Sequence, residues 1–179
     1  MYYKSLDHPE TIRQAFMNRF VLSWDAFQTQ HKDWIAKMAK TNHPVTQDWY
    51  HRAFMWEKMD SKYQSVSMKD AIAFLKEQNG NVFFITEGGD PSYCRLVDFT
   101  AEADARILAA RIAHEWYDGH RLGAQNRYNP DALFPEEVYV FDASMKWCVA
   151  FTHETTDWEA ELDDPMRVAE SRVCILCKG

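Results

Sequence analysis

The sequence predicts an α+β fold, in which an N-terminal helical layer packs on a small mixed or antiparallel sheet of about four to five strands. Up to residue 80, apolar residues recur at the spacing of a helix face. From residue 81, short β-rich runs alternate with turn residues. The 179 residues suit one domain, which we expect to comprise a helical part at 1–80 and a sheet-plus-helix part at 81–179.

Four helices are predicted in the first part, and three of them follow a Ser or Thr suited to capping a helix N-terminus. Proline or Asn-Gly marks two of their four expected ends. Their expected ranges are Pro9 to Phe20, Ser23 to the break at His43-Pro44, Gln47 to Met59 after the Thr46 cap, and Ser67 to the stop at Asn79-Gly80.

Two hairpins and a last strand are predicted in the second part. The second hairpin has apolar residues on both faces of both strands, so we expect it at the centre of the sheet with both faces covered. The expected strands are Asn81–Thr86 with Tyr93–Phe99, Glu137–Phe141 with Lys146–Phe151, and Arg172–Cys177.

A long helix is predicted at about 101–117, with Thr100 as its cap and Gly119 as its stop. The polar segment 119–135 that follows is the longest expected loop, and loops of this length often carry function.

Aromatic residues recur at helical spacing in the N-terminal helices. We expect them to pack as core between the helices, with the lining of an apolar groove as the alternative. They are Trp24, Phe27, Trp34, Trp49, Phe54 and Trp56.

The composition excludes several classes. Hydrophobic residues make up 46% and aromatic residues 15%, which is too apolar for a disordered chain. No segment reaches the roughly 18 apolar residues of a membrane span, and the first residues lack the apolar stretch of a signal peptide, so a cytoplasmic protein without membrane contact is expected. Phosphate-binding and nucleophile-elbow motifs are absent, which disfavours the enzyme classes that use them.

Charge is unevenly distributed. The net charge is −7, and residues 81–179 carry 18 acidic against 9 basic residues, whereas residues 1–80 carry 9 against 11. There is no basic run for phosphate contacts, so no nucleic-acid partner is expected, and Lys32, Lys37 and Lys40 are interpreted as a solvated helix face.

The densest acidic stretch is 154–164, which holds six carboxylates and no basic residue. It is interpreted as a solvated loop, a docking face for a basic protein, or a calcium site, although it lacks the glycine of an EF-hand loop. As a docking face, its candidate binding residues are Glu154, Asp157, Trp158, Glu159, Glu161, Asp163 and Asp164.

Four cysteines include the C-x-x-C pair Cys174 and Cys177. In a strand, positions three apart point to opposite faces, so we expect buried reduced thiols rather than a redox pair. A four-cysteine zinc site with Cys94 and Cys148 is the alternative.

A second candidate site is built on histidines. The segment His114, Glu115, Asp118 and His120 resembles a zinc-protease motif but departs from it at the fifth position, and helix capping is the competing interpretation. His153 follows a central strand, where sites of α/β proteins often lie, and the competing interpretation is an imidazole that satisfies a backbone carbonyl at the strand end.

These observations favour a protein-binding inhibitor, such as a bacterial immunity protein that neutralises a basic toxin or enzyme through an acidic surface. The alternative is a small metal- or His-dependent hydrolase, and an adaptor that binds through its N-terminal helices is a third hypothesis. No cofactor or bound metal is expected. The sequence leaves the oligomeric state open.

Overall fold

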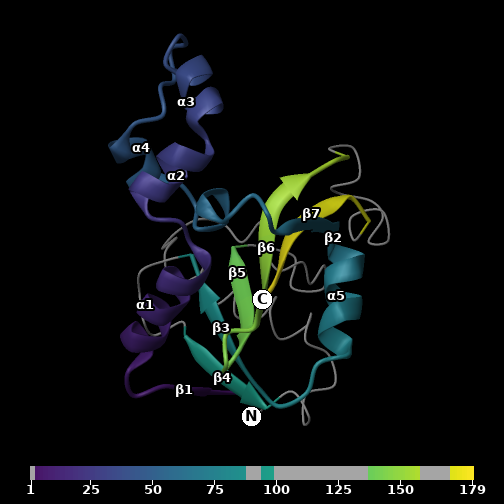
Figure 1. Cartoon of the computed structure of the whole chain (residues 1–179). Coiled ribbons are helices and arrows are strands. Elements are labelled where there is room, and N and C mark those ends of the chain that lie inside the picture. Colours follow the sequence, from purple (N-terminus) through teal and green to yellow (C-terminus); the bar gives the residue numbers. More distant parts are fainter. Residues whose placement is uncertain (1–2, 88–93, 99–136, 158–169) are drawn as a thin grey trace, which may run out of the picture.

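A computed structural model of the chain describes residues 3–87, 94–98, 137–157 and 170–179. These residues build one sheet of seven strands, in which every neighbouring pair is antiparallel, in the order β1-β4-β3-β5-β6-β7-β2 (Figure 1). The strands are β1 (Tyr3–Ser5), β2 (Gln64–Ser67), β3 (Asn81–Thr86), β4 (Arg95–Asp98), β5 (Val138–Asp142), β6 (Trp147–Thr155) and β7 (Arg172–Lys178).

The α+β class is confirmed, and helices cover the two faces of the sheet (Figure 1). Helix α1 (Pro9–Phe20) packs on one face, where the rings of Phe16 and Phe141 lie 4.8 Å apart. Helix α5 (Met68–Lys76) packs on the other face against a second core that includes Val140 and Val149. Both faces of β5 and β6 are therefore buried, as their apolar runs predict.

The strands of both predicted hairpins pair as expected. In the β5–β6 hairpin, Val138 pairs with Phe151 and Phe141 with Cys148. Strands β3 and β4 also pair antiparallel, and the turn predicted between them lies outside the described residues. The long helix predicted at 101–117 lies outside the described residues as well.

The sheet is larger than the four to five strands predicted, because residues before 80 supply both of its outer strands. β1 and β2 are short, and β2 reads Gln-Ser-Val-Ser, without the β-branched or aromatic run that marks a strand. The division into a helical part at 1–80 and a sheet part at 81–179 is therefore wrong for these two segments.

Helix α1 begins and ends where the sequence predicts, and the next two predicted helices are shorter or broken. The helix expected after Ser23 divides at His31 into α2 (Trp24–Gln30) and α3 (Lys32–Met38). The helix expected over Gln47 to Met59 is shorter than predicted, because α4 (Gln47–Arg52) stops before Met59. The segment beyond α4 leaves the helix because side chains accept its backbone N–H groups instead, and a short 3-10 helix, η1 (Trp56–Lys58), follows.

Helices α2 to α4 extend beyond one end of the sheet and pack on each other through aromatic rings (Figure 1). Phe27 is buried at their centre, 6.0 Å from the ring of Trp49, whereas Trp34 is 40% exposed. The prediction that the aromatic stripe is core is correct for Phe27. None of the described helices combines the length and the apolar character that a bilayer crossing requires.

Candidate functional site

Polar side chains come together where three neighbouring inner strands, β3, β5 and β6, have their ends on the same side of the sheet. Glu87 follows β3, Glu137 precedes β5, and the last residues of β6 lie beside Glu137, because Val138 pairs with Thr86 on one side and Phe151 on the other. The Glu87 N–H donates to the Glu137 carbonyl over 3.0 Å. Side chains distant in sequence therefore share one site.

A β-bulge near the end of β6 shapes this site. Phe151 pairs with Cys174 and Thr155 with Arg172, so four steps along β6 match two steps along β7. The extra residues are fixed by the Thr152 hydroxyl, which donates to the Val173 carbonyl over 2.7 Å, and by Arg172 Nη1, which donates to the His153 carbonyl over 2.7 Å. Bulges of this kind redirect side chains and occur often beside functional sites.

At the bulge, His153 Nδ1 lies 2.6 Å from Oε1 of Glu137. The other oxygen of Glu137 accepts a hydrogen bond of 2.9 Å from Trp56 Nε1. Burial raises the pKa of the Glu137 carboxyl group, whereas the hydrogen bonds from His153 and Trp56 act to lower this pKa. Glu137 also has a φ of 55°, a strained conformation for a residue with a side chain.

This contact fixes how the imidazole can act. A carboxylate at Nδ1 favours the neutral tautomer with a proton on that atom, which leaves the lone pair of Nε2 available. The His153 side chain is 39% exposed, and its Nε2 lies 3.7 Å from Oε1 of Glu154. The rings of Phe54 and Trp56 meet the imidazole edge-on at 5.1 and 5.6 Å and restrict its position. The arrangement suits an oriented proton acceptor.

A second buried network lies beside the first. Both oxygens of Glu87 lie 3.0 Å from the backbone N–H of Met55, and the Tyr139 hydroxyl donates to Glu87 as well. Arg13 donates to the carbonyls of Thr86 and Glu87 over 2.7 and 2.8 Å. Burial raises the pKa of the Glu87 carboxyl group, and its hydrogen bonds and nearby cations oppose this rise. These contacts tie α1 and the segment after α4 to the ends of β3 and β5.

A pocket of about 150 Å³, here termed the Glu154 pocket, lies next to the bulge. Its charged lining residues are Glu154 and Asp60, and no lysine or arginine is among the described residues that line it. Asp60 is paired with Lys62 at 3.0 Å. The complete lining is Trp56, Met59, Asp60, Ser61, Tyr63, Ser65, Thr152, Glu154, Val173 and Ile175.

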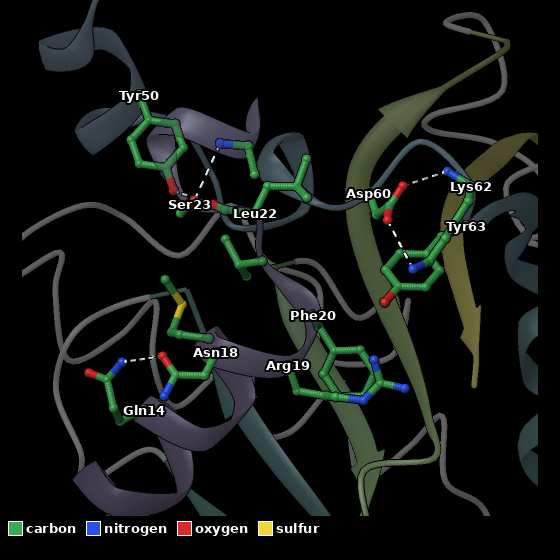
Figure 2. A pocket seen from close by; sticks show the side chains of 13 residues that line it. Gln14, Asn18, Arg19, Phe20, Leu22, Ser23, Tyr50, Asp60, Lys62 and Tyr63 are labelled. Atoms are coloured by element: carbon green, nitrogen blue, oxygen red, sulfur yellow. Dashed lines mark hydrogen bonds and ion pairs between the residues drawn. The ribbon is translucent and has the colours of Figure 1, made fainter. Parts of the chain in front are cut away.

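A larger pocket of about 580 Å³ lies between the end of α1 and the start of α2 (Figure 2). Its polar side chains bond mainly within the protein, since Gln14 donates to Asn18 over 3.0 Å and the Tyr50 hydroxyl donates to the Leu22 carbonyl. Figure 2 also shows Asp60 joined to Lys62 at its rim. Unlike the Glu154 pocket, this pocket is lined by two basic residues, Arg19 and Lys62.

The structure describes some of the predicted site residues. Glu154 lines the pocket above and Asp157 follows β6, and His153 takes part in the carboxylate contact. The other predicted binding residues lie outside the described residues, and so does the whole of the second histidine cluster. These are Trp158, Glu159, Glu161, Asp163 and Asp164, with His114, Glu115, Asp118 and His120.

The cysteines lie as the strand interpretation predicts. All four are free and buried, and Cys174 belongs to the α5-side core whereas Cys177 belongs to the α1-side core. The alternative of a four-cysteine zinc site is wrong, because Cys94, Cys148 and Cys177 are separated from Cys174 by the sheet. Within the described ranges, no group of three metal-ligating side chains is close enough to hold an ion.

Sequence reasoning missed Glu87, Glu137, Arg13 and Trp56 as site residues. The signal that pointed to His153, a polar residue at the end of an apolar strand, also marks Glu87 and Glu137. Arg13 and Trp56 carry no such signal, because one lies within a helical pattern and the other resembles core.

The chain matches no model of a known protein family, no curated protein sequence and no solved structure.

Proposed function

We propose that the chain is a protein-binding inhibitor, such as a bacterial immunity protein that neutralises a basic toxin or enzyme through an acidic surface. The proposal is carried by the exposure and the ionic contact of Glu154, the first carboxylate of the acidic stretch. Its side chain is 46% exposed, and among the described residues its ionic contact is His153 rather than a lysine or arginine. A basic side chain of a partner would supply the countercharge to the Glu154 carboxylate.

The charge of the following segment supports the same partner. Five further carboxylates follow Glu154 within ten residues, without a basic residue among them. An acidic face of this kind accelerates association with a basic protein and selects against acidic ones. Trp158, set among these carboxylates, is our candidate for the apolar anchor of the interface.

Affinity capture tests the proposal. The immobilised chain is exposed to lysate of its source cells at low salt, eluted with a salt gradient, and the retained protein is purified for titration calorimetry. We expect one basic protein at near-stoichiometric amounts. Its affinity should fall when the stretch is neutralised by Glu154→Gln, Asp157→Asn, Glu159→Gln, Glu161→Gln, Asp163→Asn and Asp164→Asn.

A matched control neutralises six exposed carboxylates of the N-terminal 80 residues: Asp7, Glu10, Asp25, Asp33, Asp48 and Glu77. The same change in net charge should leave the affinity much closer to that of the unmodified chain. Equal losses in the two variants, or retention of no basic protein, would contradict the proposal.

A second candidate function, a His-dependent hydrolase, is favoured by the 2.6 Å contact between His153 and Glu137. A carboxylate that orients an imidazole is the arrangement of a general base. Turnover of a panel of esters and phosphodiesters by the full chain, lost in His153→Ala and retained in His43→Ala, would favour this function. His43 is an exposed histidine distant in sequence from the site. Identical rates in the two variants would exclude His153 as the base.

A further inference from the structure

The Glu154 pocket combines three features that together suit one kind of side chain. Its lining includes the aromatic residues Trp56 and Tyr63, the carboxylate residue Glu154, and Ser61 and Ser65, whose hydroxyl groups are able to accept hydrogen bonds. A volume of about 150 Å³ equals the share of roughly five water molecules in the liquid, which suits a guanidinium with its adjoining methylene groups.

The charges of the lining leave Glu154 as the unneutralised group. Asp60 accepts from Gln30 Nε2 over 2.8 Å and forms its ion pair with Lys62, so its charge is compensated within the protein. Glu154 has the imidazole of His153 at 3.7 Å, which carries a full charge only when protonated. A cation that enters the pocket therefore meets one carboxylate that lacks a permanent countercharge in the described part of the chain.

Arginine fits this lining better than lysine does. Its planar, weakly hydrated guanidinium stacks on aromatic rings and presents donors in several directions at once. Lysine concentrates its charge in one strongly hydrated ammonium group, so placing it beside Trp56 and Ile175 costs more desolvation.

We propose that the Glu154 pocket receives an arginine side chain of the basic partner. This inference rests on the proposed function and deepens it, because it names the group that the partner contributes and the pocket that this group fills.

The first test uses a capped amino acid as the probe. Nα-acetyl-L-arginine N-methylamide is titrated into the full ¹⁵N-labelled chain, and the Trp56 indole and the backbone amides of residues 152–154 are followed by NMR. We expect localised, saturable shifts with a millimolar dissociation constant. The matched citrulline compound, which has the same shape without the charge, should cause none.

Two variants test the pocket itself. Glu154→Gln should weaken binding of the arginine compound about ten- to hundredfold, which is the range for a hydrogen bond to a charged group. Ser65→Leu places a larger side chain in the pocket from an exposed position on the outer strand β2 and should also abolish the shifts. Glu77→Gln, which removes one charge at the end of α5, is the matched control and should bind as the unmodified chain does.

The possible results are distinguishable. Shifts that the citrulline compound reproduces, or that survive Glu154→Gln, would overturn the inference, and equal binding of the capped lysine would overturn the preference for arginine. A captured basic partner whose affinity is unchanged by Ser65→Leu would refute the pocket while leaving the proposed function intact. Binding of arginine without any captured basic protein would refute the proposed function and the partner as the source of the arginine.

Discussion

His153 Nδ1 lies 2.6 Å from a carboxylate oxygen of Glu137, and the two residues differ sharply in exposure, with 39% for the His153 side chain and 1% for that of Glu137. The buried partner is held by Trp56 and by the backbone, so the exposed imidazole is positioned from beneath. Because the imidazole of His153 contacts the Glu137 carboxylate directly, a substitution at Glu137 should be measurable in the properties of the His153 ring.

Glu137→Gln tests this relationship. A glutamine has one acceptor oxygen where Glu137 uses two, so either His153 or Trp56 loses its acceptor. We expect a loss of about 1–3 kcal/mol in the free energy of unfolding. We also expect the neutral His153 to shift toward the tautomer protonated at Nε2, measured by the ¹⁵N chemical shifts of the ring.

Glu154→Gln is the control, because it removes the negative charge 3.7 Å from Nε2 and leaves the Nδ1 contact in place. An unchanged tautomer in Glu137→Gln would show that the carboxylate does not orient the imidazole.

The buried Glu87 predicts a pH dependence of stability. Burial raises the pKa of its carboxyl group above the ordinary value of 4.5, so the folded state holds this proton more tightly than the unfolded state does. The stabilisation is complete below pH 4.5 and is lost as the pH rises through the folded-state pKa. Urea unfolding between pH 4.5 and 8 measures this decline.

Glu87→Gln should flatten the decline by at most about 1.4 kcal/mol per pH unit, the maximum for one proton, even though the lost acceptor lowers stability at every pH. Asp48→Asn, at an exposed carboxylate, should keep the original slope. A slope that is identical in Glu87→Gln and the unmodified chain would contradict the prediction.

Asp142 holds the turn of the β5–β6 hairpin. Its Oδ1 accepts from the backbone N–H of Lys146 over 2.6 Å and of Trp147 over 3.0 Å. We expect Asp142→Asn to cost about 1–3 kcal/mol at neutral pH, measured by the urea midpoint. The exposed Glu77→Gln should change stability by less than about 0.5 kcal/mol.

The same carboxylate should act in acid with the opposite sign to Glu87. Burial by itself raises the pKa of Asp142, but hydrogen bonds from Ser144, Trp147 and Lys146 together bring it below the ordinary 3.8. Its contribution is therefore present above pH 3.8 and is lost as the pH falls through the folded-state pKa. Asp142→Asn should accordingly lose less stability than the unmodified chain on acidification below this pH.

The cysteines should be unreactive in the folded chain. Burial raises the pKa of the Cys94 thiol to about 11 and raises that of Cys174 further, so little thiolate is present at neutral pH. We expect a thiol reagent to label none of the four at the rate seen in denaturant, where all four react. Rapid labelling of Cys174 and Cys177, or a disulfide between them detected by mass spectrometry, would contradict their placement on opposite faces.

The sequence predicts the centre of the fold better than its edges, for a physical reason. β5 and β6 are apolar on both faces because both are buried, and that burial is visible in the residues. β2 owes its strand conformation to pairing with β7, more than 100 residues away, which its four residues do not reveal. Likewise, α4 ends where Glu57 and Glu87 capture backbone N–H groups, and the second capture depends on the tertiary fold.

The site was predictable only in part. The position of His153 at a strand end indicated a site, but its orientation depends on the two extra residues of the bulge, which no local pattern marks. Glu137 becomes its partner only through the register of β5 and β6. Trp56 was predicted as core, and the structure shows that its indole N–H serves a polar role.

The pairing of β2 with β7 has a consequence for synthesis of the chain on the ribosome. β2 is an edge strand, and its pairing partner β7 is synthesised about 100 residues later. At ordinary translation rates, β2 therefore remains unpaired for roughly 5 to 20 seconds. An apolar strand left unpaired for that time would invite association between nascent chains. The serine and glutamine side chains of β2 keep the unpaired strand polar until β7 has been synthesised.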